Sequence, residues 1–337
     1  MAERLDLDHE LRRNSVLDEV SGGPSPGSGG RIPRLHKLAV IALLLALVVA
    51  CVGPVLARER KSAPASAAAA ANPAILPVAP PSPAALALLD AAIAEGRLAD
   101  ARALIAPLWA ADSADVALRG AELALASASL PEAADGFQAL TEGPQAARAW
   151  QGLGITRLKQ GRQADAIAAL DKAVALDASL ARSWNARAVI ADRQKDWPMA
   201  DTAYAKAIAA APDEADFIAN RGWSLLLRGH HVAAERDLER ALALAPSNRV
   251  VQTNLALARA MQGRYQDAFR HSSRASLAID LNSVGYAAMA RGDLAVAEAY
   301  FNRALSLNPQ FDRTAWANLQ YLAELKGRRG VPMGPQP

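Results

Sequence analysis

A 34-residue period governs most of the second half of this chain and strongly limits the folds that it can adopt. Stretches of similar pattern begin at Ala149, Ser183 and Phe217, each 34 residues after the one before. A fourth begins at Val251 and is cut short, and a fifth begins at Leu281. Two degenerate copies precede them, "ALALLDAAIAEGRLADARALIAPL" and "ALRGAELALASASLPEAADGFQAL". A fixed period of this length is typical of a solenoid, in which each unit packs only on its neighbours.

Particular residue types recur at matching places in these units. Large residues stand early, at Trp150 and Trp184. Small residues follow four positions on, at Gly154, Ala188, Gly222, Ala256 and Gly285. A glycine recurs at Gly96, Gly161, Gly229, Gly263 and Gly292, with Lys195 in its place once. Alanines follow at Ala101, Ala134, Ala166, Ala200, Ala234, Ala268 and Ala297, and prolines close units at Pro212, Pro246 and Pro309.

This pattern resembles the tetratricopeptide repeat over about residues 83–325. The resemblance implies an all-α solenoid of about six to seven helix pairs, with glycine in the turn and proline after the second helix of a pair. The stretch "RTAWANLQYLAEL" is then expected to be a C-terminal cap helix. The sequence departs from the pattern at Ala178, where proline is expected, and between Gly263 and Gly292, where the spacing falls to 29. We expect this shortening to trim the end of a second helix near residues 276–280 and to change the superhelical pitch locally.

The segments outside the repeats have a different character. Residues 1–37 are polar and rich in Gly, Ser and Pro, which predicts a disordered tail. Residues 38–57 contain 20 residues without a charge, the length that a helix needs to cross a hydrocarbon core of roughly 30 Å. We therefore expect a transmembrane helix there, followed by an Ala/Pro-rich spacer over residues 58–82. Residues 326–337 are expected to be a flexible tail.

Cys51, the only cysteine, lies within this apolar segment. A single cysteine excludes an intramolecular disulfide and a Cys-based zinc site. Two interpretations of the segment stay open. The long tail before Leu38 and the apolar residues that continue to Ala57 favour an uncleaved span. Residues 48–51 are also compatible with a lipoprotein cleavage box, which would make Cys51 a lipidation site.

Both interpretations place the repeats outside the cytoplasm. Three basic residues flank the apolar segment on each side, so charge alone does not orient it. An amino-terminal apolar run behind a short basic segment nevertheless behaves as an export signal. We expect a single-pass inner-membrane protein with a cytoplasmic tail and periplasmic repeats, or a lipoprotein anchored through Cys51.

The repeat region has neither the charge of a nucleic-acid-binding protein nor the motifs of an enzyme. After Pro83 the chain has 28 Lys+Arg and 27 Asp+Glu, so it lacks the basic face that would hold phosphates. No G-x-S-x-G, H-E-x-x-H or phosphate-binding glycine loop is present. His230 and His231 are adjacent in a predicted turn and their side chains diverge, so we expect no metal site there. We expect no enzymatic activity, no cofactor and no metal.

The resemblance instead implies a binding groove lined by the first helix of each pair. The groove positions taken from this register are Arg148, Gln151, Ile155, Arg182, Asn185, Val189, Trp223, Leu226, Leu257, Met261, Asn282, Tyr286 and Met289. The amino-terminal half carries Arg and Asn, and the carboxy-terminal half carries aromatic and Met side chains, which suits an amphipathic partner segment. The alternative is that Trp223 and Tyr286 pack between repeats.

A clamp for a partner's terminal carboxylate, known in some members of the family, is not expected. Asn220 and Asn254 occupy one of its positions, but Ala219 and Thr253 stand where a cation is needed.

A narrower resemblance covers about residues 215–320. "GWSLLLRGHHVAAERDLERALALAPSNRVVQTNLALARAMQGRYQDAF" and "NSVGYAAMARGDLAVAEAYFNRALSLNP" resemble the repeat component of tight-adherence (Flp) pilus assembly in bacteria. That resemblance implies a membrane-tethered scaffold that assists secretion or assembly of an envelope machine, with protein or peptide partners. The alternative is a generic periplasmic adaptor for cytochrome maturation or outer-envelope assembly.

Overall fold

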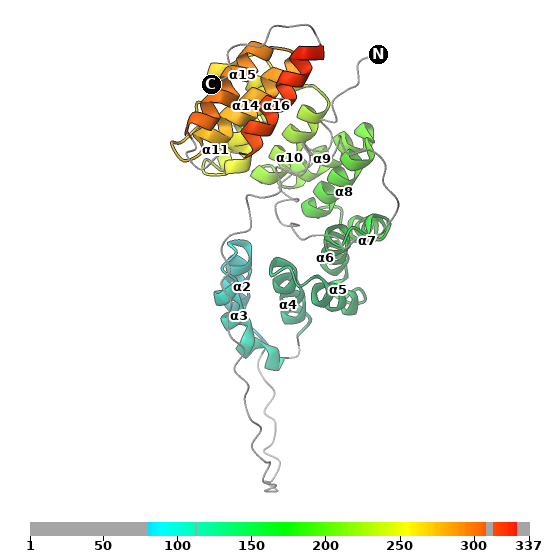
Figure 1. Ribbon diagram of the computed structural model, residues 1–337. Coiled ribbons are helices and arrows are strands. Elements are labelled where there is room, and N and C mark those ends of the chain that lie inside the picture. The colour runs from blue at the N-terminus through cyan, green and yellow to red at the C-terminus, as the bar shows by residue number, and fades with distance from the viewer. Residues whose placement is uncertain (1–79, 112, 308–312, 329–337) are drawn as a thin grey trace, which may run out of the picture.

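The computed structural model describes residues 80–111, 113–307 and 313–328, and every regular element in these ranges is a helix. Fifteen α-helices, α2 to α16, stack as successive hairpins along a curved array (Figure 1). The first helices of the units are α2 (Pro83–Ala94), α4 (Ala114–Ala126), α6 (Ala146–Lys159), α8 (Ala181–Gln194), α10 (Ala215–Leu227), α12 (Arg249–Ala260) and α14 (Leu277–Arg291). The second helices are α3 (Leu98–Ile105), α5 (Leu130–Ala139), α7 (Gln163–Leu176), α9 (Trp197–Ala210), α11 (His231–Leu244), α13 (Tyr265–Ala268) and α15 (Leu294–Leu307). The predicted all-α solenoid of helix pairs is confirmed, and α16 (Arg313–Arg328) packs on α15 and α14 as the predicted cap helix.

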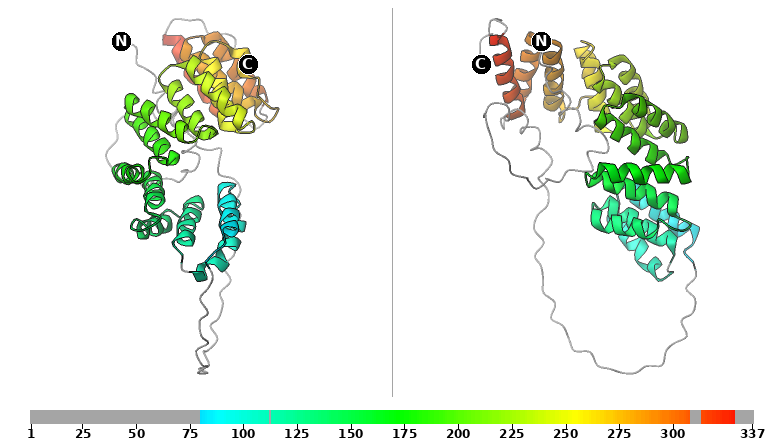
Figure 2. Two further views of the ribbon diagram at one scale, coloured as in Figure 1. Left: turned by 180° about the vertical axis from the view of Figure 1, so that it is seen from behind. Right: turned by 90° about the vertical axis from the view of Figure 1, so that its right-hand side faces the viewer.

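The units follow one another in space in the order of the sequence, as the views in Figure 2 show. Each first helix packs on the second helix of its own unit and on the next first helix or the cap helix, and α4, α6, α8, α10 and α12 also pack on the second helix of the preceding unit. The core is therefore continuous along the array rather than gathered at one centre. No helix in the described part of the chain is long and apolar enough to cross a bilayer. The predicted span at residues 38–57 lies outside the described residues.

The recurring small residues lie where the two helices of a unit touch. All seven recurring alanines of the second helices are buried. A Cβ added at Gly154 would lie 2.6 Å from Leu170 Cγ, and one added at Gly285 would lie 2.8 Å from Phe301 Cδ1. A larger side chain at either glycine would force the helices apart, because interiors packed at this density accommodate extra atoms only with strain.

The recurring turn residues adopt left-handed backbone conformations. The five repeat glycines have φ between +69° and +89°, as the resemblance implied. Lys195 holds the same conformation with φ 61°, and Ala128 does so in the second unit with φ 58°. Both residues carry a Cβ, so both turns are strained relative to their glycine counterparts.

The sixth unit departs from the others. A shortened second helix was expected here, but the predicted place of the shortening was wrong. Its second helix, α13, is a single turn that ends at Ala268 rather than near residues 276–280. Residues 277–280 instead begin α14, the next first helix. The connection is held by reciprocal bonds in which the Ser273 amide donates to Ser276 Oγ (2.9 Å) and the Ser276 amide donates to Ser273 Oγ (3.1 Å). Serine side chains that bond to nearby backbone in this way favour turns over helix, and here they form the turn that leads into α14.

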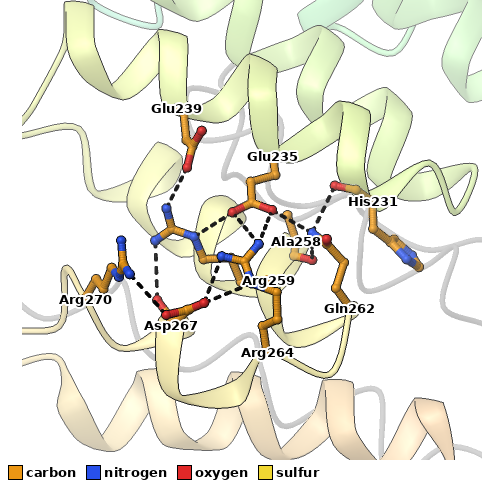
Figure 3. A network of polar contacts seen from close by, with 9 residues as sticks. All are labelled: His231, Glu235, Glu239, Ala258, Arg259, Gln262, Arg264, Asp267 and Arg270. Carbon is orange, nitrogen blue, oxygen red and sulfur yellow. Dashed lines mark hydrogen bonds and ion pairs between the residues drawn. The ribbon is translucent and has the colours of Figure 1, made fainter.

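A polar network fastens this short helix to its neighbours (Figure 3). Glu235 of α11 accepts from Arg259 Nε (2.9 Å), Gln262 Nε2 (2.8 Å) and Arg264 Nη1 (2.7 Å). Arg259 of α12 also donates to Glu239 Oε1 (2.8 Å) and to the Asp267 carbonyl (3.3 Å). The network thus joins α11, α12 and α13 where a full second helix is missing.

Candidate peptide-binding face

The predicted groove residues lie on five consecutive first helices, and we call this set of side chains the groove face. Arg148, Gln151 and Ile155 lie on α6, Arg182, Asn185 and Val189 on α8, Trp223 and Leu226 on α10, Leu257 and the capping Met261 on α12, and Asn282, Tyr286 and Met289 on α14. Their spacing of three or four residues places those of one helix on one stripe. The predicted residues of each helix therefore share one stripe along α6 to α14.

Burial divides the groove face into two groups. Arg182 is exposed, and Arg148, Leu257, Met261 and Tyr286 are half-buried, so these five can meet a partner. The other predicted residues are buried: Gln151, Ile155, Asn185, Val189, Trp223, Leu226, Asn282 and Met289. Trp223 is only 3% exposed and belongs to the core between α9, α10, α11 and α12. Trp223 therefore packs between repeats, which is the alternative that the sequence left open, and does not line the groove.

The buried amides form hydrogen bonds between neighbouring first helices. Ser183 Oγ of α8 donates to Gln151 Oε1 of α6 at 3.1 Å. Asn220 Nδ2 of α10 donates to Asn185 Oδ1 of α8 at 3.2 Å. Asn318 Nδ2 of the cap helix donates to Asn282 Oδ1 of α14 at 2.9 Å. These side chains fix the spacing of the first helices instead of pointing freely at a ligand.

The α6–α8 end of the groove face is cationic. Lys159, which the sequence analysis did not select, lies one turn after Ile155 on the same stripe of α6 and is half-buried. Burial lowers the pKa of its ammonium group, and the nearby Arg182 guanidinium lowers that pKa further. Neither Lys159 nor Arg182 forms an ion pair with another described residue, whereas Arg148 Nη2 pairs with Glu122 Oε1 at 2.9 Å. The i, i+4 spacing from Ile155 could have identified Lys159 from the sequence.

Carboxylates limit this cationic stretch on the side of α10. Asp216 in the first turn of α10 is half-buried, and burial raises its pKa. Asp192 of α8 also has a raised pKa because it is buried, although it accepts hydrogen bonds from Ser224 Oγ and Tyr204 Oη, both at 2.7 Å. Glu214, the N-cap residue of α10, interacts electrostatically with Arg182, so the positive potential is confined to the neighbourhood of Lys159 and Arg182.

The α12–α14 end of the groove face is apolar. Met261 and Leu257 pack against Ala256, Ala260 and Val284, and Tyr286 packs in the neighbouring cluster with Met289. Arg291 Nη1 donates to the Met261 carbonyl at 2.8 Å and so holds the end of α12 against the end of α14. The half-buried side chains Leu257, Met261 and Tyr286 together offer an apolar surface with a flexible thioether.

The described residues do not bring metal-ligating side chains together. Within the three described ranges, no group of three or more His, Cys, Asp or Glu side chains could hold a metal ion. His230 precedes α11 as its N-cap residue and His231 is its first residue. Burial lowers the pKa of the half-buried His231. Cys51 lies outside the described residues.

Comparison with known proteins agrees with this architecture. Residues 147–180 and 281–311 match the tetratricopeptide repeat. The chain thus contains tetratricopeptide repeats, a fold that generally serves as a non-catalytic scaffold for protein–protein interaction. A search of curated protein sequences finds no match.

Solved structures show the same fold at low sequence identity. The APC/C hetero-tetramer Cut9–Hcn1 matches 71% of this chain with a TM-score of 0.57 and 16% identity. This chain covers 49% of that one, so it spans about half the length of its relative. PilF of Pseudomonas aeruginosa has a lower structural similarity, with a TM-score of 0.40, 22% identity and coverage of 55% of this chain and 86% of that one. PilW, a widely conserved type IV pilus biogenesis factor, is similar to a comparable degree, with a TM-score of 0.42, 21% identity and coverage of 55% of this chain and 93% of that one. These two similarities do not indicate a function for this chain.

Proposed function

We propose that this chain is a non-catalytic scaffold that holds a segment of a partner protein along the groove face. The observation that carries the proposal is the change in chemistry along that face. Accessible cations at Lys159 and Arg182 give way to accessible apolar side chains at Leu257, Met261 and Tyr286. An amphipathic segment with acidic residues near one end and apolar residues near the other would complement both ends.

A selection from a displayed library of random linear peptides, carried out on the full chain, tests this proposal. We expect bound peptides that lose affinity when Arg182→Glu reverses the charge at α8 or when Met261→Ser removes the apolar surface at α12. Arg236→Glu is the matched control, because Arg236 is an exposed arginine on the second helix α11. Peptides that bind all three variants as well as the unaltered chain would contradict the proposal.

We further propose that the scaffold works in the bacterial envelope, tethered by residues 38–57 in the inner membrane with the repeats in the periplasm. The support is the uncharged 20-residue run and the sequence resemblance of residues 215–320 to the tight-adherence pilus component. A reporter that is active only in the cytoplasm, fused after Pro337, is expected to be silent. Strong reporter activity would refute this orientation.

The form of the tether and the machine that it serves can be tested separately. Intact-mass analysis of the membrane-extracted protein distinguishes an uncleaved span from a lipoprotein, because cleavage before Cys51 removes residues 1–50. Loss of surface pili on deletion supports a role in tight-adherence pilus assembly. Normal pili with a defect in cytochrome maturation or outer-envelope assembly supports the alternative adaptor role.

A further inference from the structure

A cavity of about 550 Å³ lies between the first two units, away from the groove face. Arg102 and Ile105 of α3, Trp109 of the 3₁₀-helix that follows, and Ser129 and Glu132 at the start of α5 contribute to its lining. Helix α4 forms the floor through Gly120, Leu123 and Ala124. A volume of this size falls within the range of protein binding pockets. We call it the Trp109 pocket.

The sequence explains why the pocket exists in this unit. Helix α3 ends at Ile105, and residues 106–111 continue as a 3₁₀-helix, η2 (Ala106–Ala111). Pro107 cannot donate the amide hydrogen bond that would continue the α-helical ladder beyond Ala106. The tighter 3₁₀ path redirects the side chains that follow, among them Trp109. Complete α-helices of 14 residues occupy the corresponding place in α7, α9, α11 and α15.

Trp109 forms a fixed wall of the pocket although its side chain is 53% exposed. Its indole lies directly on the backbone of α4, since a Cβ added at Gly120 would lie 2.4 Å from Trp109 Cη2. Only glycine at position 120 permits this approach. An exposed indole held in one place makes an effective binding surface, because little conformational entropy remains to be lost when a partner covers it.

Polar groups at the rim determine which partner fits. Arg102 Nη2 donates to Ser127 Oγ at 2.9 Å, and the guanidinium has no ion pair with any carboxylate in the described part of the chain. Arg102 can therefore receive a carboxylate from outside. Glu132, which also lines the pocket, likewise has no ion pair with a described residue and would repel a second carboxylate. Ile105, Leu123 and Ala124 below them are buried and apolar.

We propose that the Trp109 pocket is a second docking site, which receives one apolar side chain of a protein partner between Trp109 and Leu123 and one carboxylate of the same segment on Arg102. Trp and Arg are the residues most enriched where single contacts dominate protein interfaces. The groove face shares no residue with this pocket. The two sites can therefore be occupied independently.

The test uses displayed random peptides selected on the full chain and sorted by their response to pocket variants. Peptides of the predicted class carry an apolar residue next to Asp or Glu. We expect Trp109→Ala to weaken their binding roughly 30-fold and Arg102→Gln to weaken it several-fold. Trp316→Ala is the matched control, because Trp316 is 46% exposed at the other end of the solenoid.

Gly120→Ala guards against a loss of folding in Trp109→Ala. The added methyl group displaces the indole without removing it, and alanine favours the helix, so binding is expected to fall while the melting temperature is retained. Three results would overturn the proposal. The first is that no selected peptide loses affinity for Trp109→Ala, and the second is that the peptides that do lose affinity lack an acidic residue and bind Arg102→Gln as well as the unaltered chain. The third is that Trp109→Ala abolishes self-association, which would show that a second copy fills the pocket. Peptides that lose affinity only for Arg182→Glu or Met261→Ser bind the groove face, so failure of one proposal can be distinguished from failure of the other.

Discussion

Asn220 of α10 donates through Nδ2 to Asn185 Oδ1 of α8, and both side chains are buried. The bond joins two first helices of neighbouring units, with 3.2 Å between the donor nitrogen and the acceptor oxygen. Gln151 of α6 accepts a comparable bond from Ser183 of α8, and Asn282 of α14 accepts one from Asn318 of the cap helix. The amides that the sequence placed on a binding surface thus set the spacing of the helices that carry that surface.

Removal of one amide from this pair is expected to destabilise the solenoid. In Asn220→Ala, Asn185 Oδ1 loses a buried donor, which costs about 1–3 kcal/mol in the free energy of unfolding. Urea unfolding of Asn220→Ala, Asn185→Ala and the double variant measures the coupling. The double variant is expected to be less destabilised than the sum of the single ones, and strict additivity would contradict a direct bond.

Glu235 is expected to matter far more than Glu239, although both accept from Arg259. The Arg259 side chain is 4% exposed, so Glu235→Gln leaves a buried cation short of its main partner and should cost about 3 kcal/mol. Glu239 is 52% exposed, and Glu239→Gln should cost at most about 1 kcal/mol. Thermal unfolding of the two variants at neutral pH provides the comparison. Equal losses would show that the network does not stabilise the sixth unit through burial.

The same carboxylate predicts a loss of stability in acid. Burial acts to raise the pKa of Glu235, but hydrogen bonds from Arg259, Gln262 and Arg264 outweigh it, and the pKa is lowered overall. A lowered folded-state pKa means that the stabilisation is present above the unfolded-state pKa and is lost as the pH falls through the folded-state value. Unfolding measured from pH 7 downward should show a smaller acid-induced loss in Glu235→Gln than in the unaltered chain.

Asp192 predicts the opposite dependence on pH. Burial raises its pKa, so its contribution is fully present below the unfolded-state pKa and is lost as the pH rises through the folded-state value. Asp192→Asn keeps an oxygen for Tyr204 Oη and an amide that can bond Ser224 Oγ. The variant is therefore expected to be more stable than the unaltered chain at pH 7. A less stable variant would show that the charge of Asp192 is needed, for instance by Arg228.

The strained turns offer a test of the backbone argument. Lys195→Gly and Ala128→Gly remove a left-handed strain of about 1–2 kcal/mol. Part of that gain is offset by the greater freedom of glycine in the unfolded chain, about 0.5–1 kcal/mol, so a net stabilisation of about 0.5–1 kcal/mol is expected. Gly161→Ala, at φ 76°, should change the stability in the other direction. The denaturation midpoint is expected to rise in Lys195→Gly and Ala128→Gly and to fall in Gly161→Ala, and the opposite shifts would contradict the backbone argument.

The helix pairs could be predicted because their small residues are dictated by contact between helices. Ala166 and Gly154 allow α6 and α7 to approach, because Ala166 is fully buried and a Cβ added at Gly154 would meet Leu170. The place of Lys195 in a left-handed turn also followed from the period. Such positions leave a trace in the sequence because their geometry excludes most residue types.

The end of α13 and the burial of the amides could not be predicted in the same way. Ala268 and Ala275 keep the spacing of a complete second helix, but α13 ends at Ala268 and Ser273 and Ser276 form a turn through local bonds that have no periodic pattern. Register gave the face on which Gln151 and Asn185 lie, but their burial depends on how closely adjacent units approach. The Trp109 pocket depends likewise on a contact between Trp109 and Gly120 in different helices.

Photo-crosslinking in living cells tests the central claim most directly. A photoreactive residue placed at position 182 on the groove face, in the full-length chain, is compared with one placed at position 236 on α11. The account predicts a protein adduct from position 182 that is absent from position 236 and is weakened when Met261→Ser is added. An adduct from position 236 alone, or an equal one from both positions, would contradict the claim that the groove face holds the partner.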